Sequence, residues 1–146
     1  MSKQNKNKAQ LLAILEILKS GYWYDKKVQA VLRPFGISHE QFNVLRILEH
    51  NLSRSYSLKE IQSRLMNQTA NTTRLVEKLK LKKLVNSSYS KTNRRKLEIT
   101  ITKSGINLLV KIHTPLMELA SQVDSVLSNK DAELLIKILR KFRKAS

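Results

Sequence analysis

Apolar residues recur at intervals of three and four along most of the chain, and this spacing predicts a mainly helical protein. Capping patterns place the starts of two helices, because Ser38 with Gln41 and Ser57 with Glu60 each form the capping-box sequence. The pattern as a whole predicts helices at about residues 9–32, 38–50, 57–65, 69–83 and 102–127, and a last one from residue 128.

A different pattern interrupts the helices. Residues 84–89 and 97–102 are rich in β-forming side chains, and apolar and polar residues alternate in the second run, so that one face of a hairpin can pack on helices. The tip between the two strands is polar and basic. Two short helices followed by a basic hairpin is the order of a winged helix-turn-helix, which puts one helix in the DNA major groove and the hairpin beside the backbone or in the minor groove. The fold class we predict is mainly α with a small β-hairpin wing.

Charge supports a polyanionic partner. The 146 residues include 28 Lys or Arg and 11 Asp or Glu, which gives a net charge of +17. Cations near phosphates release counterions and so favour binding. Ten cations but two acids lie between residues 71 and 103, where the predicted module would meet double-stranded DNA. An architectural or RNA-binding protein without strong sequence specificity is the alternative, although the aromatic content of 5% is low for base stacking.

Other classes of protein find little support. The chain has no cysteine, and His39, His50 and His113 fall on different predicted elements, so we expect no metal, no cofactor and no enzymatic activity. We expect the His39 side chain to be at the surface. No apolar run is long enough to span a bilayer, no helix shows a clean basic face opposite an apolar one, and no signal peptide is evident, so we expect a cytoplasmic protein without a membrane partner.

The candidate DNA contacts fall in two groups. The exposed side of the helix predicted at 69–83 mixes small, hydrogen-bonding and cationic side chains, which suit base edges in the major groove. The residues expected there are Thr69, Asn71, Thr72, Thr73, Arg74 and Lys78. The residues expected in the wing are Lys91, Asn93, Arg94, Arg95 and Lys96. A solvated surface would explain either group alone, but a helix followed directly by a basic hairpin favours DNA contact.

Residues 30–145 resemble MarR-type transcriptional regulators. The run Thr73 to Leu79 is similar to the recognition helix of that family, and Ile101 to Gly105 is similar to the end of its wing. The family's wing commonly carries an acid, any residue and then an arginine. Here Asn93 takes the place of the acid and Arg95 that of the arginine. Asparagine can still accept a hydrogen bond from a guanidinium, without charge assistance.

The resemblance implies a homodimer on a pseudo-palindromic operator. We expect a single domain over residues 1–146, with the DNA-binding module at about 37–105 and dimerisation helices at about 9–33 and 103–144. A heptad-like apolar stripe in the predicted fifth helix suits a helical partner, although an intrachain core would show the same pattern. Its members are Leu109, Ile112, Leu116, Leu119, Val123 and Val126.

The resemblance also implies a small aromatic or anionic effector, bound where the dimerisation helices meet the DNA-binding module. The residues expected to form this pocket are Trp23, Tyr24, Phe42, Arg46 and His113. Ordinary core aromatics are the alternative, because a pocket needs convergent polar groups that a sequence does not place.

Overall fold

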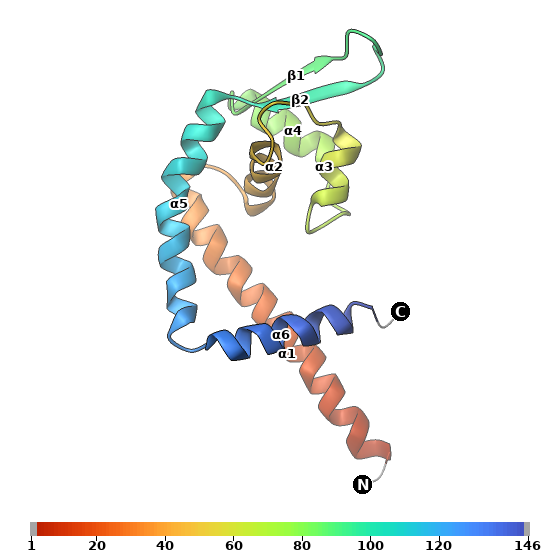
Figure 1. Ribbon diagram of the computed structural model, residues 1–146, viewed down its shortest axis with the longest axis vertical. Helices are drawn as coiled ribbons and strands as arrows, with labels where there is room; N and C mark the ends of the chain where they lie inside the picture. The colour runs from red at the N-terminus through yellow and green to blue at the C-terminus, as the bar shows by residue number, and fades with distance from the viewer. Residues whose placement is uncertain (1–2, 145–146) are drawn as a thin grey trace.

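Long helices from the two ends of the chain carry a group of shorter elements (Figure 1). The computed structural model describes residues 3–144. The long helices are α1 (Lys3–Leu32), α5 (Lys103–Asp124) and α6 (Asn129–Phe142). Between α1 and α5 the chain forms a 3-10 turn (Arg33–Phe35), α2 (His39–Glu49), α3 (Leu58–Arg64), α4 (Thr72–Leu81) and the strands β1 (Val85–Tyr89) and β2 (Leu97–Ile101). The predicted class, helices with one small hairpin, is confirmed.

Side-chain caps begin the helices where the sequence placed them. Ser38 Oγ accepts the Gln41 amide at 3.1 Å, and the Gln41 side chain accepts the Ser38 amide in return. Ser57 and Glu60 form the same box at α3. Each box satisfies two backbone donors that the first turn leaves without a partner. Two predicted starts are wrong. The helix α1 begins at Lys3 rather than at about residue 9, and α4 begins at Thr72 rather than Thr69, because Asn71 caps it.

The two strands pair antiparallel, with Val85 opposite Ile101 and Tyr89 opposite Leu97. The predicted alternation is confirmed, since Ile99 is fully buried in the core and Leu97 and Ile101 pack against it. The loop before α3 joins the sheet through Tyr56, whose backbone exchanges hydrogen bonds of 2.9 and 2.8 Å with Ile99. The hairpin is therefore anchored to the helical module along one edge.

The apolar stripe of α5 is largely an intrachain contact. Leu109, Ile112 and Leu119 are buried, and α5 packs against α1 and α2. The expectation that this stripe mainly serves a partner is therefore wrong for these three positions, because α1 and α2 already cover them. Val126, in contrast, is 80% exposed. No helix among the described residues is long and apolar enough to cross a membrane.

Many apolar side chains of α1 and α6 are exposed, although Val28 and Leu32 at the end of α1 are buried. Along α1 the exposed set is Leu11, Leu12, Ile14, Leu15, Leu18, Tyr22, Trp23 and Tyr24. Along α6 it is Leu134, Leu135, Ile136, Ile138 and Phe142. None of the residues of α6 is buried. A contiguous apolar surface of this kind on a water-exposed protein marks an interaction site.

Candidate nucleic-acid interface

The helix α4 presents a polar face to solvent. Thr73, Arg74 and Lys78 are exposed, while Leu75, Val76 and Leu79 point into the core. Asn71 precedes the helix as its cap, and its side-chain oxygen accepts the Arg74 amide at 3.0 Å. This oxygen therefore already has a structural partner, so the role expected for Asn71 in reading an adenine competes with capping.

Two threonines predicted at this face lie elsewhere. Thr72 is 5% exposed and faces the core, because the first turn of α4 packs against α2 and α3. Its inclusion among the groups on the DNA-facing surface is wrong. Thr69 is exposed but lies in the turn before the helix, where its hydroxyl donates to Asn67 Oδ1 at 2.6 Å. The later start of α4 accounts for the position of Thr69, whereas packing of the first turn accounts for the burial of Thr72.

The base of the wing is locked to the end of α4. Lys83 adopts a positive φ of 58°, and the amides of Lys83 and Leu84 donate back to the carbonyls of Lys80 and Leu79. This is a Schellman ending, formed here without glycine. Thr102 then bridges the wing to α5: its hydroxyl donates to the Lys83 carbonyl at 2.8 Å and accepts the Gly105 amide at 3.0 Å. The recognition helix, the hairpin and α5 thus meet at one junction.

At the tip of the wing, Asn93 organises the turn through the backbone. Its side-chain oxygen accepts the Arg95 amide at 3.1 Å, and its carbonyl accepts the Lys96 amide at 2.9 Å. The expectation was a hydrogen bond to the guanidinium, and the observed partner is instead the backbone of the same arginine. All five predicted wing residues are exposed, and the two arginines extend from a turn whose backbone is fixed.

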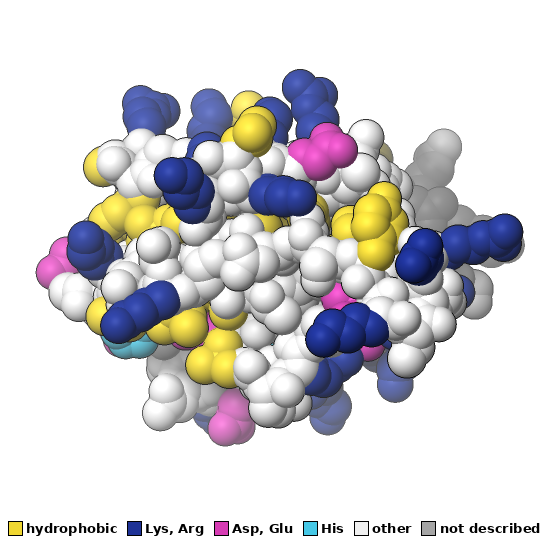
Figure 2. Space-filling model, turned by 90° about the horizontal axis from the view of Figure 1, so that it is seen from above, with side chains coloured by type: hydrophobic (Ala, Val, Ile, Leu, Met, Phe, Trp, Pro, Cys, Tyr) yellow, Lys and Arg dark blue, Asp and Glu magenta, His cyan; other side chains and the backbone are white. Residues whose placement is uncertain are grey.

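The electrostatics of this end of the molecule are strongly positive. Thirteen Lys or Arg lie between residues 54 and 103, against three acids. Among the ion pairs of the described residues, one uses a cation from this range, Arg54 with Glu60. Figure 2, which looks down on the hairpin end, shows many Lys and Arg side chains on this face and few Asp or Glu. The surface is suited to a phosphate backbone.

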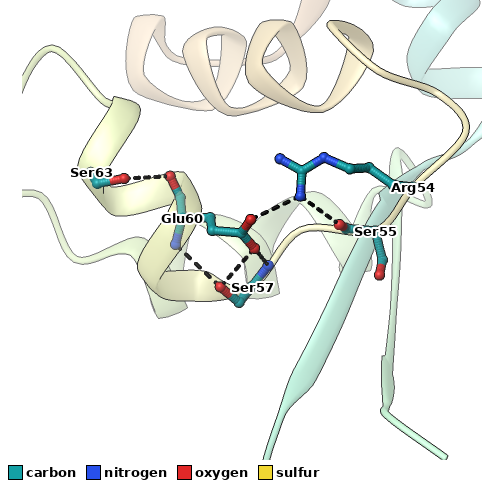
Figure 3. A network of polar contacts seen from close by, with 5 residues as sticks. All are labelled: Arg54, Ser55, Ser57, Glu60 and Ser63. Atoms are coloured by element: carbon teal, nitrogen blue, oxygen red, sulfur yellow. Dashed lines mark hydrogen bonds and ion pairs between the residues drawn. The ribbon is translucent and has the colours of Figure 1, made fainter.

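A network that the sequence did not reveal holds the start of α3 (Figure 3). Glu60 accepts the Ser57 amide at 2.8 Å and pairs with Arg54 at 2.8 Å. The Ser57 amide, the Arg54 guanidinium and the Ser57 hydroxyl together lower the pKa of Glu60 from 4.5 to about 2. The bond to Glu60 also raises the pKa of Arg54. Arg54 lies over the ring of the buried Tyr56, 3.9 Å from its centroid. The sequence predicted the capping box but not its additional partner Arg54, six residues before Glu60.

The predicted effector residues separate into two groups. Phe42, Arg46 and His113 line one hollow of about 350 Å³ between α2 and α5, together with Leu109, Leu116 and Met117. Trp23 and Tyr24 are not among its lining residues, and both lie on the exposed side of α1, 55% and 37% exposed. They are neither part of this hollow nor core aromatics. The chain therefore brings three of the five predicted residues together.

One further contact joins the long helix α1 to α2 of the DNA-binding module. His39, the first residue of α2, lies 2.5 Å from an oxygen of Asp25 on α1 through its Nδ1. The His39 side chain is 18% exposed, so it is not the surface group that the sequence suggested. The position of His39 at a helix start suggested an exposed side chain, but α1 lies against this end of α2 and covers most of it.

A helix-turn-helix with a basic hairpin fixed to the end of its second helix defines a winged helix-turn-helix DNA-binding protein. The MarR family model matches residues 37–97. The HTH-type transcriptional regulator MhqR of Bacillus subtilis is 29% identical over 110 residues, which are 75% of this chain and 74% of MhqR. These matches, together with the fold, support a MarR-family DNA-binding transcription regulator.

Solved structures share the fold. S. aureus MepR in its complex with DNA has a TM-score of 0.80 at 22% identity, covering 90% of this chain and 95% of MepR. Bordetella bronchiseptica BpsR, whose DNA binding is regulated by 6-hydroxynicotinic acid, has a TM-score of 0.76 at 22% identity, covering 90% of this chain and 93% of BpsR. These similarities extend beyond the module to the long helices.

Proposed function

We propose that this protein binds a pseudo-palindromic operator as a homodimer, reading bases with α4 and gripping the backbone with the wing. The observation that carries the proposal is the exposed polar face of α4 beside a wing whose base is locked to the end of that helix. The module at about 37–105 would meet DNA, and helices at about 9–33 and 103–144 would dimerise. We place its action in the cytoplasm and propose no enzymatic role for it.

The two faces have separate tasks in this proposal. Thr73, Arg74 and Lys78 would lie in the major groove, where arginine can bind a guanine edge in bidentate fashion. Arg94 and Arg95 would lie beside or in the minor groove, with Lys91 and Lys96 on phosphates and Asn93 holding the turn. Thr69 and Asn71 border the first turn of α4. An architectural protein would need only the positive charge, and it would have no use for the mixture of hydrogen-bonding and cationic side chains on α4.

The test compares Arg74→Ala with Arg95→Ala on an operator recovered by selection from random DNA, using single-base variants at fixed salt. Arg74→Ala should relax preference at particular positions by about 1 to 3 kcal/mol, because one bidentate contact is lost. Arg95→Ala should weaken binding to most sequences and lose selectivity mainly at A·T-rich flanks. Glu77→Gln, on the same helix, serves as the control for general effects on α4.

Two results would contradict this assignment: wild-type affinity in Arg95→Ala, or a uniform loss in Arg74→Ala without any change in base preference. A charge-only binder would also show equal affinity for unrelated duplexes. For about 6 to 10 neutralised phosphates, the log-log salt slope should lie near −5 to −9. A slope shallower than about −2 would contradict duplex binding by these faces.

A small anionic, aromatic effector would bind the hollow lined by Phe42, Arg46 and His113. The Phe42 ring offers an apolar contact, and Arg46, now paired with Glu49 at 2.6 Å, offers a cation. The relative BpsR responds to an aromatic acid. Titration with 6-hydroxynicotinic acid should lower the DNA affinity of the wild type, and Arg46→Gln should remove the response while DNA affinity stays unchanged. An identical response in Arg46→Gln would exclude this hollow.

A further inference from the structure

The cations of α6 lie outside the interface described above. Six Lys or Arg occur in residues 130–146, against two acids. In Figure 1, α6 lies at the end of the molecule opposite the hairpin, with α5 between them. The 22 residues of α5 span about 33 Å at a rise of about 1.5 Å each. A stretch of duplex held by α4 and the wing is therefore remote from these charges.

The helix α6 has two sides of different chemistry. The helical repeat places Lys130, Lys137, Arg140 and Lys141 along one side, and Lys144 follows in the turn after the helix; we call these five residues the α6 basic face. All five are exposed. One acid, Glu133, lies on the same side. The opposite side carries Leu135, Ile138, Leu139 and Phe142. We expected no helix with a clean basic side opposite an apolar one, and α6 departs from that expectation in part, because its cations and apolar residues lie on opposite sides while Glu133 lies among the cations.

The charges of this face are not balanced within the chain. Among the described residues, no cation of α6 lies within 4.0 Å of a carboxylate oxygen. Lys137 and Lys141 are four residues apart, and like charges at this spacing repel one another on a helix. Glu133, four residues before Lys137, offsets only one of the five cations. An anionic partner would remove this repulsion.

We propose that the α6 basic face binds the phosphate backbone of a second DNA duplex without sequence preference, so that one dimer can hold two duplexes. From Lys130 to Lys141, the last cation within α6, the face is about 17 Å long, against which one strand of a duplex presents about five phosphates. A bilayer surface fits less well, because it requires the apolar side of the same helix, and the proposed dimer uses that side. The inference rests on that dimer and on operator binding by the first face.

A bead assay tests the second site directly. A biotinylated duplex carrying the operator is loaded with protein, washed, and offered a fluorescent duplex of unrelated sequence. Wild-type protein should capture the second duplex, and for about four neutralised phosphates capture should fall about a hundredfold between about 50 and 200 mM salt. The triple variant Lys137→Gln, Lys141→Gln, Lys144→Gln should load normally but capture at least about tenfold less.

The matched control removes three charges from the wing instead: Arg94→Gln, Arg95→Gln, Lys96→Gln. This variant should not bind the immobilised operator. A loss of operator binding therefore shows in the loading step, and a loss of the second site shows only in the capture step. Sedimentation checks that the α6 variant keeps the mass of the wild type. Equal capture by the α6 variant, or loading without any capture by the wild type, overturns the proposal. Binding to phosphatidylserine vesicles without duplex capture overturns it in favour of a lipid surface.

Discussion

At the scale of single residues, two glycines illustrate opposite constraints. A Cβ at Gly105 would lie 2.4 Å from the Leu84 carbonyl oxygen, whereas a Cβ at Gly21 has nothing within 4 Å. Gly105→Ala should therefore push the wing base and α5 apart and destabilise the fold by about 1 to 3 kcal/mol. Gly21→Ala, within α1, should stabilise it by about 0.5 to 1 kcal/mol, because glycine weakens a helix interior. Urea unfolding measures both, and equal shifts of the same sign would contradict the close approach at Gly105.

At the scale of elements, the start of α3 depends on an ionised Glu60. Its pKa is about 2 in the folded chain and near its ordinary 4.5 when unfolded, so its contribution to stability is complete above pH 4.5 and is lost as the pH falls toward 2. Glu60→Gln should be destabilising at pH 7, and the difference from wild type should shrink between pH 4.5 and pH 2. Unfolding free energies at several pH values measure this, with the exposed Glu118→Gln as control. A pH-independent difference would mean that the charge has no role.

At the scale of the whole molecule, the exposed apolar sides of α1 and α6 predict the homodimer. Sedimentation should give about twice 16.9 kDa without DNA. Leu135 and Ile138 are 44% and 52% exposed in the single chain, so replacing both with Gln should leave the chain folded but dissociate the dimer. Each buried side chain of this size contributes about 1.5 to 3 kcal/mol. Leu52→Gln, in the exposed loop after α2, is the control. A wild-type monomer at micromolar concentration would refute the prediction.

Local rules account for what could be predicted. Capping boxes at Ser38 and Ser57 fixed two helix starts, and alternation around Ile99 fixed the buried face of the hairpin, because both depend on residues within a few positions of one another. The basic tip of the wing could also be predicted, because its charged residues are contiguous in the sequence. The start of α4 was missed because Thr69, Asn71 and Thr72 are all acceptable caps, and packing selected Asn71.

The sequence by itself determined the order of helices, the hairpin and its charge, because periodicity and composition act over short distances. Only the tertiary structure decided which sides of those elements are covered. It buried Thr72, paired His39 with Asp25, and covered most of the α5 stripe within the chain. Periodicity shows which residues share a side of a helix, but what lies against that side depends on elements far away in the sequence. For the same reason, only the folded chain shows that the side chains of Trp23 and Tyr24 are exposed.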